Sequence, residues 1–118
     1  MKVFTDIYCT VEFAACHYWP EAPDEVAFLR TAHRHVFHVT LWKSAGGLDR
    51  SIEFIMLKRE LTAFVRQRYE EKTFKLSCEQ IAAEIIKEFS GSACKVSEDG
   101  ENGAQVTLVA TCRDIMEI

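Results

Sequence analysis

The sequence predicts an α+β domain with the element order β-β-α-α-β-β, in which a four-stranded antiparallel sheet carries two helices on one face. Three observations lead to this fold class. Apolar and polar residues alternate in the first part of the chain, apolar residues then recur twice at helical spacing, and two short strand-like runs follow. The 118 residues are too few for a second core, so we expect a single domain that spans residues 1–118.

Two alternating runs predict the first pair of strands. In residues 3–17 most odd positions are apolar and polar side chains fall between them, which is the period of a half-buried strand. His17 continues this odd face. In the second run, Phe37 shares the odd face with His33 and His35, so both imidazoles are expected to point inward. The least regular part of the chain, residues 18–32, lies between the two runs.

The period then changes to that of two helices. Apolar residues at helical spacing predict an amphipathic helix of about five turns from near Ser51, which covers a face of the sheet. Ser77 forms a capping box with Gln80, and this box starts a second helix that ends near residue 90. Two short strands and a tight turn close the chain: residues 94–98, the Asn102-Gly103 turn and residues 105–112.

Composition limits the classes of partner and compartment. The formal net charge is −4 and the chain has no basic stripe, so we expect no nucleic-acid partner. The apolar stretches are short and are broken by charges, so we expect no membrane span, no signal peptide and a cytoplasmic location. Five cysteines without a C-x-x-C pair suit reduced thiols better than a disulfide framework, and Cys9 and Cys94 are expected in the core.

Three histidines are the strongest functional signal. If the first two strands pair antiparallel, His17, His33 and His35 converge at one mouth of the sheet. Three neutral imidazoles with an open fourth position describe a catalytic Zn²⁺ site. A histidine at the edge of an apolar face is also commonly a hydrogen-bonded core residue, so spacing alone leaves both interpretations open. His38 lies on the opposite face and is expected to be an ordinary surface or interface histidine.

Five short motifs occur in order along nearly the whole chain. They are FAACH (residues 13–17), HRHVF (33–37), EFIMLK (53–58), SCEQ (77–80) and VSE (96–98). These motifs resemble F-x-A-x-H, H-G-H-x-Y/F, D-F-x-x-L-K, P-T-x-E-N and V-x-E-T of the 6-pyruvoyltetrahydropterin synthase family. That family includes the bacterial 6-carboxytetrahydropterin synthases of queuosine biosynthesis. Each motif alone is weak, whereas five in the right order are fairly specific.

The resemblance implies a tunnelling-fold (T-fold) domain in which His17, His33 and His35 bind Zn²⁺. It also implies that Glu98 grips two N–H groups of a pterin or related ring. A carboxylate can accept two parallel N–H bonds from such a guanidine-like ring edge, as it does from arginine. Glu98 beside Asp99 is also typical of an exposed acidic residue at a strand end. The family joins subunits into a barrel, commonly two stacked rings of three, so we expect a homohexamer. The open edges of a four-stranded sheet also favour self-association.

The general base of the family is missing from its expected positions. In the family a cysteine lies four or six residues before the first histidine of H-x-H, where this chain has Leu29 and Ala27. A variant group has glutamate three residues before that histidine, where this chain has Arg30. The family's Asp-His pair has no counterpart in residues 67–74. Proton abstraction beside a carbonyl needs a group of tuned pKa within hydrogen-bond reach.

Four substitutes for the base are open. Cys16 adjoins a histidine but points to the other strand face, and Cys78 lies in a first helical turn, where the dipole is expected to lower its pKa. Asp24 and Glu25 lie in the loop that leads to His33, and a zinc-bound hydroxide is the fourth candidate. The catalytic residues are therefore left unassigned.

Two classes of function follow. The first is a divergent zinc-dependent carbon-oxygen or carbon-carbon lyase that acts on a dihydroneopterin-type pterin, in pterin or queuosine-precursor metabolism. The second is a non-catalytic pterin- or purine-binding module, a pseudoenzyme that retains the metal site, and the missing base favours it chemically. A third interpretation is an unrelated small hydrolase that uses zinc-bound water.

Overall fold

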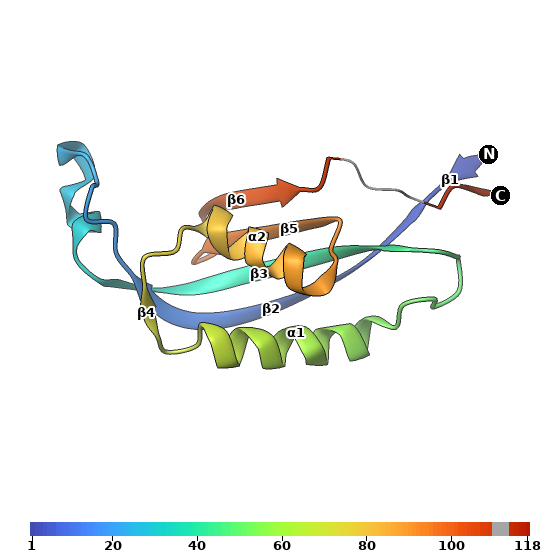
Figure 1. Cartoon of the computed structure of the whole chain (residues 1–118), viewed down its shortest axis with the longest axis horizontal. Coiled ribbons are helices and arrows are strands. Elements are labelled where there is room, and N and C mark those ends of the chain that lie inside the picture. The colour runs from blue at the N-terminus through green and yellow to red at the C-terminus, as the bar shows by residue number, and fades with distance from the viewer. Residues whose placement is uncertain (110–113) are drawn as a thin grey trace.

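The computed structural model describes residues 1–109 and 114–118 and has α+β architecture (Figure 1). Its helices and strands follow one another in this order: β1 (Lys2–Val3), β2 (Thr5–His17), the 3₁₀ helix η1 (Asp24–Arg30), β3 (His33–Ala45), α1 (Phe54–Arg68), β4 (Thr73–Phe74), α2 (Cys78–Phe89), β5 (Ala93–Glu98), β6 (Asn102–Thr107) and β7 (Met116–Glu117). The predicted class is thus confirmed, and η1 adds a helical turn within the stretch that we expected to be least regular.

The main sheet is mixed and has five strands in the order β4-β2-β3-β5-β6. β2 and β3 pair antiparallel over thirteen residues, and β5 and β6 extend the sheet, also antiparallel. The prediction of four antiparallel strands is therefore wrong in one respect, because β4 pairs parallel with the end of β2. β4 has only two residues, too few to produce an alternating pattern. The Cys16 N–H donates to the Lys72 carbonyl at 3.0 Å and fixes this pairing.

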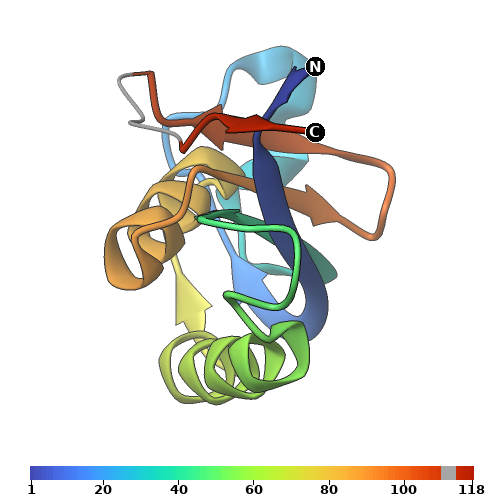
Figure 2. The same ribbon diagram turned by 90° about the vertical axis from the view of Figure 1, so that its right-hand side faces the viewer.

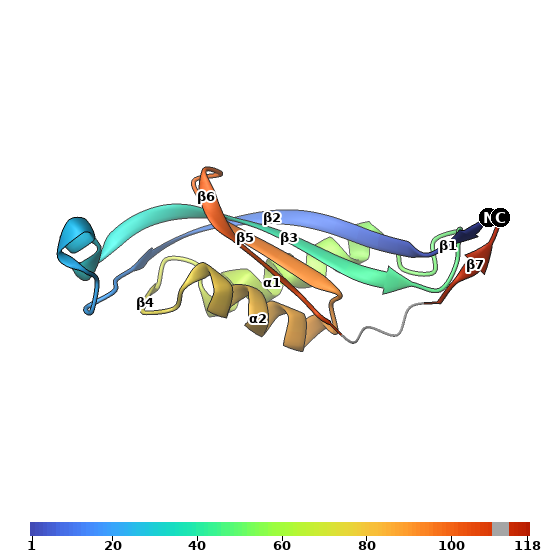
Figure 3. The ribbon, with the colours of Figure 1, turned by 90° about the horizontal axis from the view of Figure 1, so that it is seen from above.

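Both α-helices cover one face of the curled sheet, as Figures 2 and 3 show. The buried residues of α1 and α2 join the odd face of β2 and β3 in one hydrophobic core. Within it the Phe13 ring stacks on Phe37 at 5.0 Å and on Tyr69 at 5.2 Å between centroids. Cys9 and Cys94 are buried as predicted. The far end of the long β2–β3 pair projects beyond the helices toward the β1–β7 sheet, where both termini lie (Figure 1).

The helix boundaries follow from their caps. α2 has the predicted capping box of Ser77 and Gln80 and ends at Phe89, followed by Ser90 as the C-cap residue with a left-handed backbone of φ 53°. α1 begins at Phe54 rather than near Ser51, because the Glu53 carboxylate accepts the N–H groups of Ile55 and Met56 and so caps the helix there. None of the helices in residues 1–109 and 114–118 is both long and apolar enough to cross a membrane.

The last hairpin turns earlier than predicted. The turn comprises residues 99–101, whereas Asn102 and Gly103 belong to β6. Asp99 and Gly100 have φ of 56° and 72°, the left-handed pair that a tight hairpin turn requires. The sequence holds two such signals, Asp-Gly and Asn-Gly, and the first of them forms the turn. β6 ends at Thr107, and positions 110–112 of the predicted last strand lie outside the described residues.

Candidate metal centre

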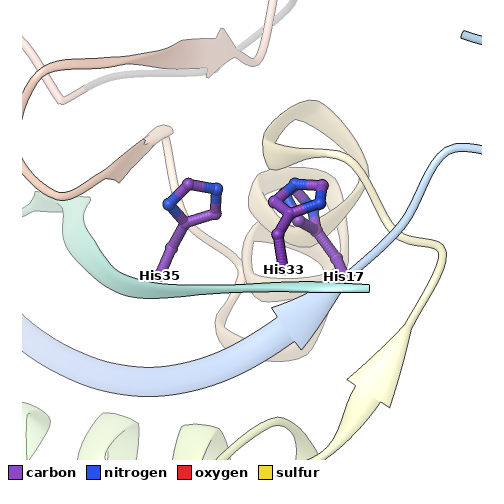
Figure 4. A group of neighbouring side chains, drawn as sticks. All are labelled: His17, His33 and His35. Atoms are coloured by element: carbon purple, nitrogen blue, oxygen red, sulfur yellow. The ribbon is translucent and has the colours of Figure 1, made fainter. Parts of the chain in front are cut away.

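The antiparallel pairing of β2 and β3 brings three histidines together, as predicted. His17 ends β2 directly opposite His33, which begins β3, and His35 follows on the same face two residues later. The ring centroids lie 4.6 Å apart for His17 and His33, 5.3 Å for His17 and His35, and 5.0 Å for His33 and His35. All three rings project from the same side of the strands (Figure 4). One nitrogen from each ring lies within 4.8 Å of the other two.

The outer nitrogen of each ring faces a hydrogen-bond acceptor. His17 Nδ1 lies 3.1 Å from the Leu76 carbonyl oxygen, and His33 Nδ1 lies 2.9 Å from that of Thr31. His35 Nδ1 lies 2.6 Å from a carboxylate oxygen of Asp99. These contacts fix the orientation of the rings and direct Nε2 toward the centre of the group.

The inner nitrogens suit a metal ion. His33 Nε2 and His35 Nε2 are buried and make no hydrogen bond within the described residues. Burial, as the largest cause, lowers the pKa of His17 and so favours the neutral imidazole, which is the form that binds metal. Three neutral imidazoles that carry outer hydrogen bonds are the donor set of a zinc site. The group can therefore hold a metal ion, and its chemistry fits Zn²⁺.

Glu98 lies beside the histidines, at the end of β5. Its Oε1 is 3.1 Å from His17 Nε2 and its Oε2 is 3.3 Å from His35 Nε2. The Cys78 thiol donates to Oε1 at 3.9 Å. The Glu98 side chain is 28% exposed, so it borders both the histidine group and solvent.

A cavity of about 740 Å³ opens next to the histidines, within the size range of small-molecule sites. The end of β2, the segment before α2, the first turn of α2 and the β5–β6 hairpin form most of its wall. Its lining residues are His17, Tyr18, Trp19, Pro20, Glu21, Leu29, His33, Lys75, Leu76, Ser77, Cys78, Glu79, Gln80, Glu98, Asn102 and Gly103.

Neither position of the resembled family's cysteine carries a thiol in this chain. Leu29 lines the cavity where the resembled family has its cysteine, and Ala27 is exposed. Our expectation for Cys78 is wrong, because burial and the neighbouring Glu98 raise its pKa to about 12 instead of lowering it. Cys16 is half-buried. Asp24 is exposed, and its Oδ1 forms an ion pair with Nη2 of Arg30 at 2.6 Å.

The segment that follows α1 has structural contacts instead of an Asp-His pair. The Tyr69 ring is buried, and its hydroxyl donates to Glu84 at 2.6 Å. Glu70 accepts the Ala14 N–H at 2.9 Å, and Glu71 forms a two-bond ion pair with Arg34. These acidic side chains therefore hold the connection after α1 against β2 and β3.

Asp99 is the site residue that sequence reasoning missed. One of its carboxylate oxygens contacts His35, and the other accepts the Val36 N–H at 2.9 Å. The Val36 N–H, as the largest cause, and His35 lower the pKa of Asp99. The Asp99-Gly100 turn signal could have indicated this role, because it places residue 99 at the tip of the hairpin next to β3.

His38 lies where we expected it. Its side chain is partly exposed, and its Nδ1 lies 3.3 Å from Oε1 of Glu12 on the other face of the sheet.

No protein-family model matches the chain, and no curated protein matches it. The geometry of the histidines, Glu98 and the adjoining cavity therefore carries the functional argument, together with the motifs described above.

Proposed function

We propose that this chain is a zinc protein of the 6-pyruvoyltetrahydropterin synthase type, with a T-fold, that binds a dihydroneopterin-type pterin. The observation that carries the proposal is the convergence of three imidazole nitrogens beside a carboxylate at the edge of a cavity. His17, His33 and His35 would hold the ion. Zinc bound there would act as a Lewis acid on a hydroxyl or carbonyl group of the ligand's side chain.

Glu98 is the group that would recognise the ring. A pterin presents two N–H groups on one edge, and a carboxylate can accept both in the way that it accepts arginine. Glu98 lines the cavity and remains partly exposed, so an incoming ring can reach it. Asn102 and Gly103 line the same wall and supply further polar groups.

The charge of the cavity favours a pterin without a triphosphate. Lys75 is the only lysine or arginine among the residues that line it, whereas Glu21, Glu79 and Glu98 contribute carboxylates. The Lys75 ammonium also lies over the Tyr18 ring, 5.8 Å from its centroid. A triphosphate would meet net negative charge in this subunit, and a neutral ring edge would not.

Two candidate functions share this site and differ in chemistry. A divergent lyase needs a base near the ligand's side chain, and Leu29 lines the cavity at the position of the resembled family's cysteine. This observation favours the second candidate, a non-catalytic pterin-binding module that retains the metal. In both candidates the chain's own residues bind and orient the ring.

Self-association would complete the sheet. β4 covers only the last two residues of β2, so most of that long strand is an edge, and β6 is the other edge. Unpaired strand edges are commonly covered by another chain. We propose the homohexameric barrel of the resembled family as the assembly that pairs them.

The test combines metal analysis, binding and product analysis. Purified protein should contain about one Zn²⁺ per chain by elemental analysis, because residues 1–109 and 114–118 contain one three-histidine group. The His33→Ala variant should lose most of it, and the matched His38→Ala control should not. Equal zinc in the wild-type and His33→Ala proteins would refute the metal site.

Calorimetry with a simple pterin should then show binding to the zinc-loaded wild type and none to a zinc-loaded Glu98→Ala variant. Equal binding to both proteins would refute the ring contact. Product analysis with dihydroneopterin triphosphate and with simpler pterins distinguishes the two candidates. Turnover supports the lyase, and binding without turnover supports the module.

A further inference from the structure

Glu98 faces the inner nitrogens of two of the histidines. Nδ1 of His17 and of His35 faces the Leu76 carbonyl and the Asp99 carboxylate respectively. Nε2 of the same two rings faces the two oxygens of Glu98 at 3.1 and 3.3 Å. Imidazole nitrogens and carboxylate oxygens are both ligand atoms for Zn²⁺, so one ion can be shared between them.

The distances agree with a shared metal ion. With zinc–nitrogen and zinc–oxygen bonds of about 2.0–2.1 Å, neighbouring ligand atoms of a tetrahedral site lie about 3.3 Å apart. The distance from His17 Nε2 to Oε1 of Glu98 and the distance from His35 Nε2 to Oε2 are close to this value, so each carboxylate oxygen faces one histidine at ligand spacing. The Cys78 thiol donates to Oε1 from the first turn of α2 and helps to orient the carboxylate toward the histidines.

We infer that Glu98 is the fourth ligand of the metal in the ligand-free protein, and that a ring which binds Glu98 draws this carboxylate away from the metal. The first half depends only on the histidine group, and the second half rests on the proposed function. The Glu98 carboxylate can bind either the metal or the ring. Binding of the ring therefore lowers the affinity for the metal, and binding of the metal lowers the affinity for the ring. Displacement of Glu98 converts a closed, four-ligand site into one with an open position when the ring arrives.

Glu98 differs in this respect from a residue that only contacts the ring. A pure ring contact leaves the metal affinity of the ligand-free protein unchanged when it is removed. A fourth ligand lowers that affinity in the absence of any ring. The two roles are therefore separable by measurements on the protein without pterin.

The experiment uses Zn²⁺ competition with a chromophoric chelator and the visible absorption of the Co²⁺-loaded protein, which reports ligand number and geometry. Loss of an outer-shell partner typically lowers metal affinity about 10- to 100-fold, and we expect Glu98→Ala to lower zinc affinity at least that much. We also expect its cobalt spectrum to differ from that of the wild type. The Glu101→Ala control removes an exposed carboxylate from the same hairpin and should leave both readouts unchanged. Circular dichroism verifies that each variant is folded.

Equal zinc affinity and identical cobalt spectra for the wild type and Glu98→Ala would overturn the fourth-ligand assignment. A simple pterin is then added to the cobalt-loaded wild type. A shift of the spectrum toward that of Glu98→Ala supports the exchange, and pterin binding without any shift overturns it. A clear metal effect of Glu98 together with no pterin binding refutes the proposed function and leaves the fourth ligand in place.

Discussion

Replacement of Asp99 should weaken metal binding even though this residue is not a ligand. Its carboxylate holds His35 Nδ1 at 2.6 Å and the Val36 N–H at 2.9 Å, and so fixes both the tautomer and the orientation of the imidazole. Loss of such an outer partner lowers metal affinity about 10- to 100-fold. The Asp99 side chain is 47% exposed, so water can replace it in part, and we expect a loss near the lower limit, about tenfold.

The backbone determines which substitution tests this prediction. Asp99 has φ of 56°, a conformation that strains alanine but suits glycine and asparagine. Asp99→Gly removes both contacts and keeps the turn, whereas Asp99→Asn retains one acceptor oxygen and should fall between Asp99→Gly and the wild type. Zinc affinity by chelator competition is the assay, with Glu101→Ala as the matched control. A zinc affinity for Asp99→Gly equal to that of the wild type would refute the argument that this carboxylate orients His35.

Four further results are expected. Burial lowers the pKa of His17 and favours its neutral form, so zinc should remain bound at pH 7 and be released only on acidification below the ordinary histidine pKa of about 6.5. Elemental analysis after dialysis that showed release at neutral pH would contradict this order. The raised pKa of Cys78, about 12, should make its alkylation at pH 8 at least about tenfold slower in the folded protein than in urea, as peptide mass spectrometry can measure. Tyr69→Phe should lower the free energy of unfolding by about 1 kcal/mol in urea titration, because it removes the bond to Glu84 but keeps the buried ring, and no change would show that this bond contributes nothing. Light scattering should give a mass several times 13.5 kDa, and a monomer at micromolar concentration would argue against the barrel.

The strand periodicity was sufficient to predict the histidine group, because alternation fixes which side chains share a face and antiparallel pairing fixes which ends meet. The observed pair of His17 and His33 follows directly from those two rules. The same rules could not find β4, since two residues carry no period and the strand depends on backbone bonds to β2. They also could not find Asp99, whose contact with His35 depends on the left-handed turn that reverses the chain at that residue.

The failed expectation for Cys78 has a different physical origin. Cys78 does lie in the first turn of a helix, where a helix dipole favours a thiolate. The thiol is, however, buried next to the Glu98 carboxylate, and both desolvation and like charge oppose ionisation more strongly than the dipole favours it. Burial and the identity of a neighbour 20 residues away in the sequence are properties of the tertiary structure.

A metal ion held by the three histidines would also affect the excursion between β2 and β3. Residues 18–32 leave the sheet immediately after His17 and return immediately before His33, so a metal bound by both histidines closes this loop at its base. The η1 helix within it buries no side chain, and the loop is otherwise tied by few bonds, such as that from the Trp19 N–H to the Leu29 carbonyl. Metal binding thus adds directly to the free energy of local opening of this segment. Since Trp19 and Leu29 also line the cavity, we expect the shape of the cavity, its amide exchange rates and its resistance to proteases to vary with metal content.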